Sequence, residues 1–183
     1  MILYFHGGSW KLGRPELFKL NAQHWIERGY VVIMPSYRRI PKFCYVDMRE
    51  DLNGILRLLP QILEENDWTS KGIVLGGISA GGNLAAAMLY DRTALQDCNF
   101  SRDNFKAIFL LSAPLDLSVM KKTPVLKSFV GKPFDVMITK ASPISYLDHD
   151  ETHPILCIHG TADGLVPFSN NSFIRKCGSR NKS

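Results

Sequence analysis

The stretch Ile73-Val74-Leu75-Gly76-Gly77-Ile78-Ser79-Ala80-Gly81-Gly82, residues 73–82, joins a short apolar strand to a helix through a turn of small residues. A serine on such a turn is held in a strained backbone conformation, and its hydroxyl projects from the edge of the sheet. Only very small neighbours tolerate so tight a bend, and they are supplied by Gly76, Gly77, Ala80, Gly81 and Gly82. The stretch therefore predicts a nucleophile at Ser79. The backbone amide of Ala80, at the start of the helix, is expected to face a developing oxyanion.

Apolar runs rich in β-branched and aromatic residues alternate with segments of helical periodicity along the whole chain. Strands are expected at residues 2–5, 30–34, 72–75, 106–111 and 155–158, and each ends at turn residues. Helices are expected at residues 16–28, from 47 to about 65, and from 80 to 89. We expect Pro60 to kink or shorten the second helix, because it lacks an amide donor. The alternation predicts an α/β fold with a mostly parallel β-sheet flanked by helices, in a single domain over residues 1–183.

Residues 118–143 interrupt this alternation. Lys121-Lys122, Pro124, Gly131 and Pro133 punctuate the segment, and its apolar residues follow no sustained period. Long irregular stretches are uncommon in compact domains unless they have a role, and ligands of α/β folds bind at the carboxyl ends of the strands. We interpret the 118–143 segment as a candidate lid over that edge, with an ordinary surface crossover as the alternative.

The first strand ends in His6-Gly7-Gly8-Ser9-Trp10, which predicts a second set of oxyanion donors. Consecutive glycines let a backbone approach a ligand closely and turn its amides toward it. We assign Gly8 and Ser9 as these donors. For His6 and Trp10 we favour structural roles, as a hydrogen-bonded histidine and an aromatic wall.

A carboxylate is expected where the last strand ends. Asp163, in His159-Gly160-Thr161-Ala162-Asp163, is the best candidate, since a carboxylate there can orient a catalytic imidazole and stabilise its charged form. The alternative is Asp116, which follows the preceding strand. Its competing role is to cap the 118–143 segment.

Composition limits the other classes of function. The chain has 183 residues, of which 45% are hydrophobic and 21% charged, as in an ordinary globular domain. No apolar run is long enough for a membrane span, and the start has no signal-peptide pattern, so a cytoplasmic location is the default. The net charge of +5 comes from scattered residues, which argues against a nucleic-acid partner. Four separated cysteines suggest neither a zinc site nor disulfides, and no metal or cofactor is implied.

Taken together, these motifs resemble the α/β-hydrolase fold, in particular the esterase/lipase branch of hormone-sensitive lipase and bacterial carboxylesterases, with some likeness to kynurenine formamidases. The resemblance rests on residues 6–10, Tyr37-Arg38-Arg39 with Pro41, residues 77–83, Ser142-Pro143 and residues 159–167. It implies hydrolysis of a small-molecule carboxylic ester, or an amide, by a serine, an acid and a histidine in that chain order. It also implies an oxyanion hole at Gly8, Ser9 and Ala80. Ser9 stands where many members have a third glycine.

One part of the family pattern is missing. The family's catalytic histidine lies downstream of the acid, but no histidine follows Asp163; all five, at positions 6, 24, 149, 153 and 159, occur earlier. The chain also opens inside the strand that ends in His-Gly-Gly. It thus resembles an α/β-hydrolase core without its first strands and its last strand and helix.

Two expectations follow from that deficit. The chain is expected to be catalytically impaired and to expose a sheet edge through which it can self-associate. The alternatives to an ester hydrolase are a non-catalytic module that binds a small ligand or a protein, an arylformamidase-like amide hydrolase, and a fragment without function.

Overall fold

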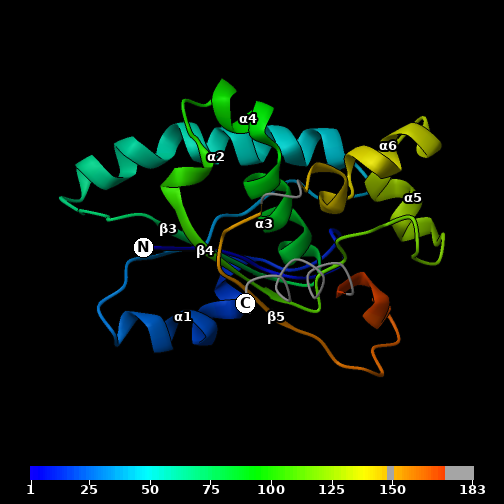
Figure 1. Ribbon diagram of the computed structural model, residues 1–183, viewed down its shortest axis with the longest axis horizontal. Coiled ribbons are helices and arrows are strands. Elements are labelled where there is room, and N and C mark those ends of the chain that lie inside the picture. The colour runs from blue at the N-terminus through cyan, green and yellow to red at the C-terminus, as the bar shows by residue number, and fades with distance from the viewer. Residues whose placement is uncertain (148–150, 172–183) are drawn as a thin grey trace.

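The computed structural model describes residues 1–147 and 151–171, and within them one five-stranded sheet forms the centre of the molecule (Figure 1). All pairings are parallel, in the order β2-β1-β3-β4-β5. The strands are β1 (Ile2–Phe5), β2 (Val32–Ile33), β3 (Ile73–Ile78), β4 (Phe105–Leu111) and β5 (Ile155–Ile158). The predicted α/β class with a mostly parallel sheet is confirmed. The second strand is shorter than the expected 30–34, although Val31 still accepts a hydrogen bond from the amide of Ile2 (2.8 Å).

Helices cover the sheet on both sides (Figure 1). Helix α1 (Lys19–Ile26) lies on one face, and α2 (Tyr45–Glu65), α3 (Ala80–Tyr90) and α4 (Arg92–Asp97) lie on the other. The helix expected at 16–28 is split into a 3₁₀ turn, Pro15–Phe18, and α1, because Phe18 leaves helical dihedral angles (φ −113°, ψ 13°). Helix α4 was not predicted; the side chain of Asp91 caps it by accepting from the amide of Ala94 (3.0 Å).

Pro60 does not shorten α2. The helix continues through it to Glu65, while Met48, Leu52, Leu56 and Leu59 bury one face of the helix in the core. Most helical stability in proteins comes from such packing rather than from local propensity. Pro60 itself is exposed, so the turn that lacks its amide donor is open to water.

The 118–143 segment is more regular than expected. It contains two seven-residue helices, α5 (Pro124–Val130) and α6 (Phe134–Lys140), followed by a 3₁₀ turn, Pro143–Tyr146. Two turns of helix are too short for a hydrophobic period to stand out, which is why the sequence pattern did not reveal them. Both helices lie at the end of the molecule toward which the strands run, at the right in Figure 1.

The described residues leave one part of the sheet exposed. The face of β4 and β5 beside α1 forms an apolar groove of about 560 Å³, lined by Trp25, Phe109, Leu156 and Ile158 among others. Leu156 and Ile158 are each 57% exposed. None of the described helices is both long enough and apolar enough to cross a bilayer.

Candidate active site

Ser79 occupies a sharp turn between the end of β3 and the start of α3. Its backbone has φ 52° and ψ −121°, a left-handed conformation that costs a non-glycine residue about 1–3 kcal/mol. Two backbone hydrogen bonds fix it: its amide donates to the carbonyl of Leu111 (2.8 Å), and its carbonyl accepts from the amide of Asn83 (3.1 Å). The residue is only partly buried. The side chain therefore has the placement that a nucleophile needs, at the carboxyl edge of the sheet.

Two glycines allow the turn to be this tight. A Cβ atom on Gly77 would lie 2.5 Å from the carbonyl carbon and oxygen of Gly81. A Cβ on Gly81 would lie 2.2 Å from the carbonyl oxygen of Phe5, at the end of the neighbouring strand β1. These distances are far below van der Waals contact, so β3, α3 and β1 meet backbone to backbone at the base of Ser79.

The loop that follows β1, residues 6–13 (the 6–13 loop), passes beside Ser79. A Cβ on Gly7 would lie 3.6 Å from the Cβ of Ser79. Gly8, Ser9 and Trp10 then follow with φ of 131°, 54° and 56°, and the carbonyl of Gly8 accepts from the amide of Leu12 (2.8 Å). Among the described residues, the amides of Gly8, Ser9 and Ala80 have no hydrogen-bond partner. The two turns that carry the predicted oxyanion donors are thus adjacent, and the donors are unpaired.

The segment that follows β2 holds the 6–13 loop in place. The hydroxyl of Tyr37 donates to the carbonyl of His6 (2.8 Å), and the amide of Ile40 donates to the carbonyl of Trp10 (3.0 Å). The guanidinium of Arg39 donates to the carbonyl of Gly13. These contacts give a structural reason for the Tyr-Arg-Arg motif that the resemblance had singled out.

Asp163 lies in the turn after β5. Its Oδ1 accepts from the amides of Val166 (3.0 Å) and Leu165 (2.9 Å), which hold the pKa of this carboxyl below its usual range. The nearby hydroxyl of Ser112 makes a smaller contribution in the same direction. Ser79 follows β3 and Asp163 follows β5, so only β4 separates the two turns. The end of β4 contacts the Ser79 turn, since the carbonyl of Leu111 accepts from the amide of Ser79.

Sequence reasoning missed Ser112. It lies at the end of β4, between the strands that carry Ser79 and Asp163, and its φ of 46° is another left-handed value. In the sequence, Ser112 stands directly after the expected strand at residues 106–111. The strand order that makes this meaningful comes only from the structure.

Asp116, the alternative acid, is engaged in its own turn. Its Oδ1 accepts from both the amide (2.9 Å) and the hydroxyl (2.5 Å) of Ser118. Its backbone amide donates to Oδ1 of Asn170 (2.7 Å). With these bonds, Asp116 holds the turn at the start of the 118–143 segment, which is the capping role given above as the alternative to catalysis.

Each of the four described histidines hydrogen-bonds to a partner other than Ser79. His6 contacts the carbonyl of Gly7 and is stacked on Tyr37; burial, the main cause, lowers the pKa of its imidazole. His24, on α1, hydrogen-bonds to Arg28, which lies just beyond the end of that helix. Nε2 of His159 donates to the carbonyl of Val166 (2.8 Å). The same nitrogen lies 3.5 Å from Oδ2 of Asp163. His149 lies outside the described residues.

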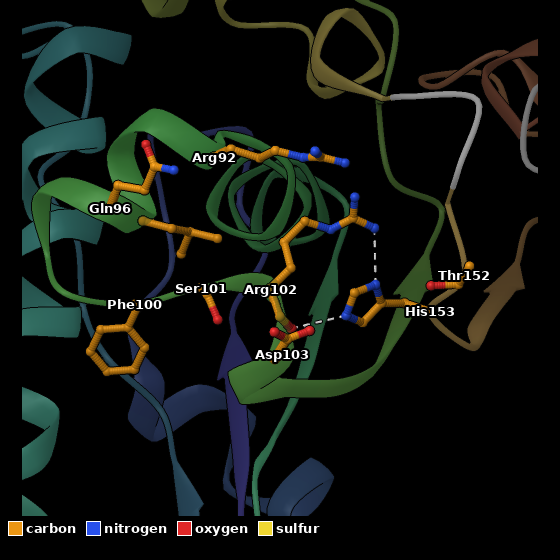
Figure 2. A pocket seen from close by; sticks show the side chains of 9 residues that line it. Arg92, Gln96, Phe100, Ser101, Arg102, Asp103, Thr152 and His153 are labelled. Carbon is orange, nitrogen blue, oxygen red and sulfur yellow. Dashed lines mark hydrogen bonds between the residues drawn. The ribbon is translucent and has the colours of Figure 1, made fainter.

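His153 precedes β5 and therefore lies at the opposite edge of the parallel sheet from Ser79. Figure 2 shows it in a pocket of about 310 Å³, where Nε2 donates to the carbonyl of Arg102 (2.9 Å). Its Nδ1 is 2.9 Å from Oε1 of Glu151 and 3.0 Å from the Arg102 guanidinium. In this position the side chain cannot act on a substrate at Ser79.

The relationship to known proteins follows from this geometry. The model of the BD-FAE family matches residues 1–176. The chain belongs to the BD-FAE family. It is 32% identical over 189 aligned residues to an esterase of Gibberella moniliformis, covering 91% of this chain and 57% of the relative. A kynurenine formamidase of Danio rerio is 26% identical over 160 residues, covering 86% of this chain and 50% of the relative.

Solved structures show the same fold for this BD-FAE family member. Esterase B of Lactobacillus rhamnosis superposes with a TM-score of 0.78 at 20% identity, covering 98% of this chain and 62% of that one. A bifunctional GH43-CE protein of Bacteroides eggerthii gives 0.82 at 18% identity, covering 99% of this chain and 29% of that one. The chain is thus an α/β-hydrolase of an esterase family. It spans about half the length of the curated relatives it matches.

Proposed function

We propose that this chain carries the nucleophile, the oxyanion hole and the acid of a serine hydrolase that acts on carboxylic esters. Ser79 Oγ attacks the acyl carbon, and the amides of Gly8, Ser9 and Ala80 bind the oxyanion. The alcohol leaves with the proton of the serine hydroxyl. Water then cleaves the acyl-serine, releasing the acid and restoring the hydroxyl. The observation that carries the proposal is the strained Ser79 turn packed against a loop with unpaired amides.

Asp163 has the role of orienting a histidine that is absent from these 183 residues. Without that base, the serine hydroxyl is almost wholly protonated at neutral pH, and losing the base in a comparable hydrolase costs on the order of a million-fold in turnover. The chain by itself is therefore an impaired enzyme. The oxyanion hole sustains a residual rate.

Chemical rescue tests this assignment. Free imidazole supplies the missing general base, so it should accelerate labelling of Ser79 by a fluorophosphonate probe, read by intact-mass spectrometry. Ser79→Ala should show no labelling with or without imidazole, whereas Ser118→Ala should label like the wild type. Equal labelling of Ser79→Ala and the wild type would overturn the proposal.

The acid is tested in the same assay. Asp163→Asn should reduce imidazole-stimulated labelling by at least about tenfold, because the carboxylate orients and stabilises the imidazolium. Asp116→Asn is the matched control and should leave labelling unchanged. If Asp116→Asn reduced the labelling and Asp163→Asn did not, Asp116 rather than Asp163 would be the acid.

The acyl substrate is an ester in this proposal, and an amide or formamide is the alternative. The same machinery serves both, and the relatives include an esterase and a kynurenine formamidase. Imidazole-rescued turnover of p-nitrophenyl acetate, compared with N-formylaniline, distinguishes them. A Ser79-dependent rate on the anilide alone would favour the amide hydrolase.

A binding module is the second candidate, favoured by the lack of any histidine after Asp163. It predicts that a small carboxylic ester binds with equal affinity to the wild type and to Ser79→Ala, with no covalent product even in imidazole. Ser79-dependent turnover contradicts it.

A further inference from the structure

An aromatic stack joins the 6–13 loop to the 118–143 segment. The indole of Trp10 lies over the ring of Phe129 in α5, with centroids 3.9 Å apart and planes within 10°. Both side chains are buried, at 4% and 0% exposure. Phe129 also meets Tyr45, at the start of α2, edge to face at 5.7 Å. The phenyl ring is therefore fixed between the loop and the helical layer.

The backbone beneath this stack is strained. Ser9 and Trp10 both have left-handed φ values, 54° and 56°, although neither is glycine. Such conformations persist only where the surroundings determine them. The carbonyl of Trp10 is held by the amide of Ile40, but its indole Nε1 is buried without a hydrogen-bond partner among the described residues. The side chain is thus held by ring contact rather than by a polar bond.

Polar bonds fix the 118–143 segment at its two ends instead. The Ser142 hydroxyl donates to the carbonyl of Ile138 (2.7 Å) and accepts from the amide of Leu117 (2.9 Å). The amide side chain of Asn83, in α3, donates to the carbonyls of Pro114 (2.9 Å) and Ala141 (3.1 Å). With the ends anchored in this way, the Phe129 ring joins the middle of the segment to the loop.

We propose that Phe129 is a positioning residue for the oxyanion hole: by stacking on Trp10 it keeps Gly8 and Ser9 in the conformation that presents their amides at Ser79. The inference rests on the proposed hydrolase function. In this proposal the 118–143 segment also supports the 6–13 loop, because displacement of α5 would release Trp10 and let the Ser9 backbone relax. The oxyanion hole is then complete only when α5 is seated.

Phe129→Leu tests this in the full chain, since leucine keeps the position apolar but removes the ring. Phe134→Leu is the matched control, because Phe134 lies in α6 of the same segment and its ring faces Lys122 instead. The imidazole-rescued labelling rate should fall about tenfold or more in Phe129→Leu, since losing an oxyanion donor costs on the order of 10²- to 10³-fold. It should stay within about twofold in Phe134→Leu. Trp10→Phe preserves a stack and should label several-fold faster than Trp10→Leu.

Amide hydrogen exchange gives a readout independent of chemistry. In Phe129→Leu, the amides of residues 8–12 should exchange faster while those of β3 keep their protection. Unchanged exchange at residues 8–12, or equal acceleration across the whole sheet, would overturn the inference. If Ser79→Ala labels like the wild type, the hydrolase proposal fails while the exchange comparison still reports on the loop.

Discussion

The backbone amide of Ser112, directly after β4, donates to the carbonyl of Ile158, the last residue of β5, at 2.8 Å, and the Ser112 hydroxyl helps to lower the pKa of Asp163. A single residue therefore attaches the turn after β5 to the end of β4, the strand beside the Ser79 turn. The turn that carries Asp163, the proposed acid, thus begins at a strand end that is fixed to β4.

Removing the Ser112 hydroxyl should change the titration of the Asp163 carboxyl. In Ser112→Ala the pKa of Asp163 should rise toward its usual range, because one of the causes that lower it is removed; NMR titration of the side-chain carboxyl measures the change. Ser118→Ala, which removes a hydroxyl–carboxylate bond at Asp116, should leave the pKa of Asp163 unchanged. An unaltered Asp163 titration in Ser112→Ala would show that the two backbone amides suffice.

The tight turn predicts a contrast between two glycine substitutions. Gly81→Ala should lower the free energy of unfolding by about 2 kcal/mol or more, because the new methyl group would overlap the backbone of Phe5 and His6. Gly54→Ala, within α2, has open space around its Cβ and should gain about 0.5–1 kcal/mol. Urea unfolding measures both. Equal effects would mean that β1 can yield to the added methyl.

His6 should make the chain sensitive to mild acid. Because burial lowers the pKa of this imidazole in the folded state, the unfolded state binds the proton more readily. Stability should therefore fall as the pH drops below the unfolded value of about 6.5. His6→Phe keeps a ring against Tyr37 but cannot titrate, so its stability should depend less on pH between 7 and 5. A slope identical to that of the wild type would contradict the assignment.

Self-association is expected through a sheet edge, and we predict that the apolar groove on the face of β4 and β5 also contributes to it. Ile158→Lys should shift the chain toward the monomer in sedimentation velocity runs at increasing concentration. Leu58→Lys changes a residue of similar exposure (55%, against 57%) on α2, across the sheet, and should leave association unchanged. A monomeric wild type at every concentration would show that this face stays solvated.

Much of the scaffold could be predicted because its signals are local. Each strand is a short apolar run with a glycine, proline or serine within two residues of its end, and the glycines around Ser79 mark the bend before the helix. Helices α5 and α6 escaped detection because seven residues carry too little periodicity. Pro60 was overweighted because the packing of α2 outweighs one missing amide.

The contacts between elements are what sequence patterns could not supply. The hydrogen bond from the amide of Ser112 to the carbonyl of Ile158 depends on β4 lying next to β5. The stack of Trp10 on Phe129 joins residues more than a hundred positions apart. His153 could be assigned to the far edge of the sheet only once it was clear that β5 runs parallel to its neighbours.

The close approach of Gly77 to Gly81, and of Gly81 to the end of β1, has a mechanical consequence. With no gap between the three backbones, thermal fluctuations cannot slide the turn after β3 past the loop after β1, and the two must travel as one rigid body. Deformation of the rest of the sheet therefore leaves the spacing between the serine oxygen and the amides of that loop nearly constant.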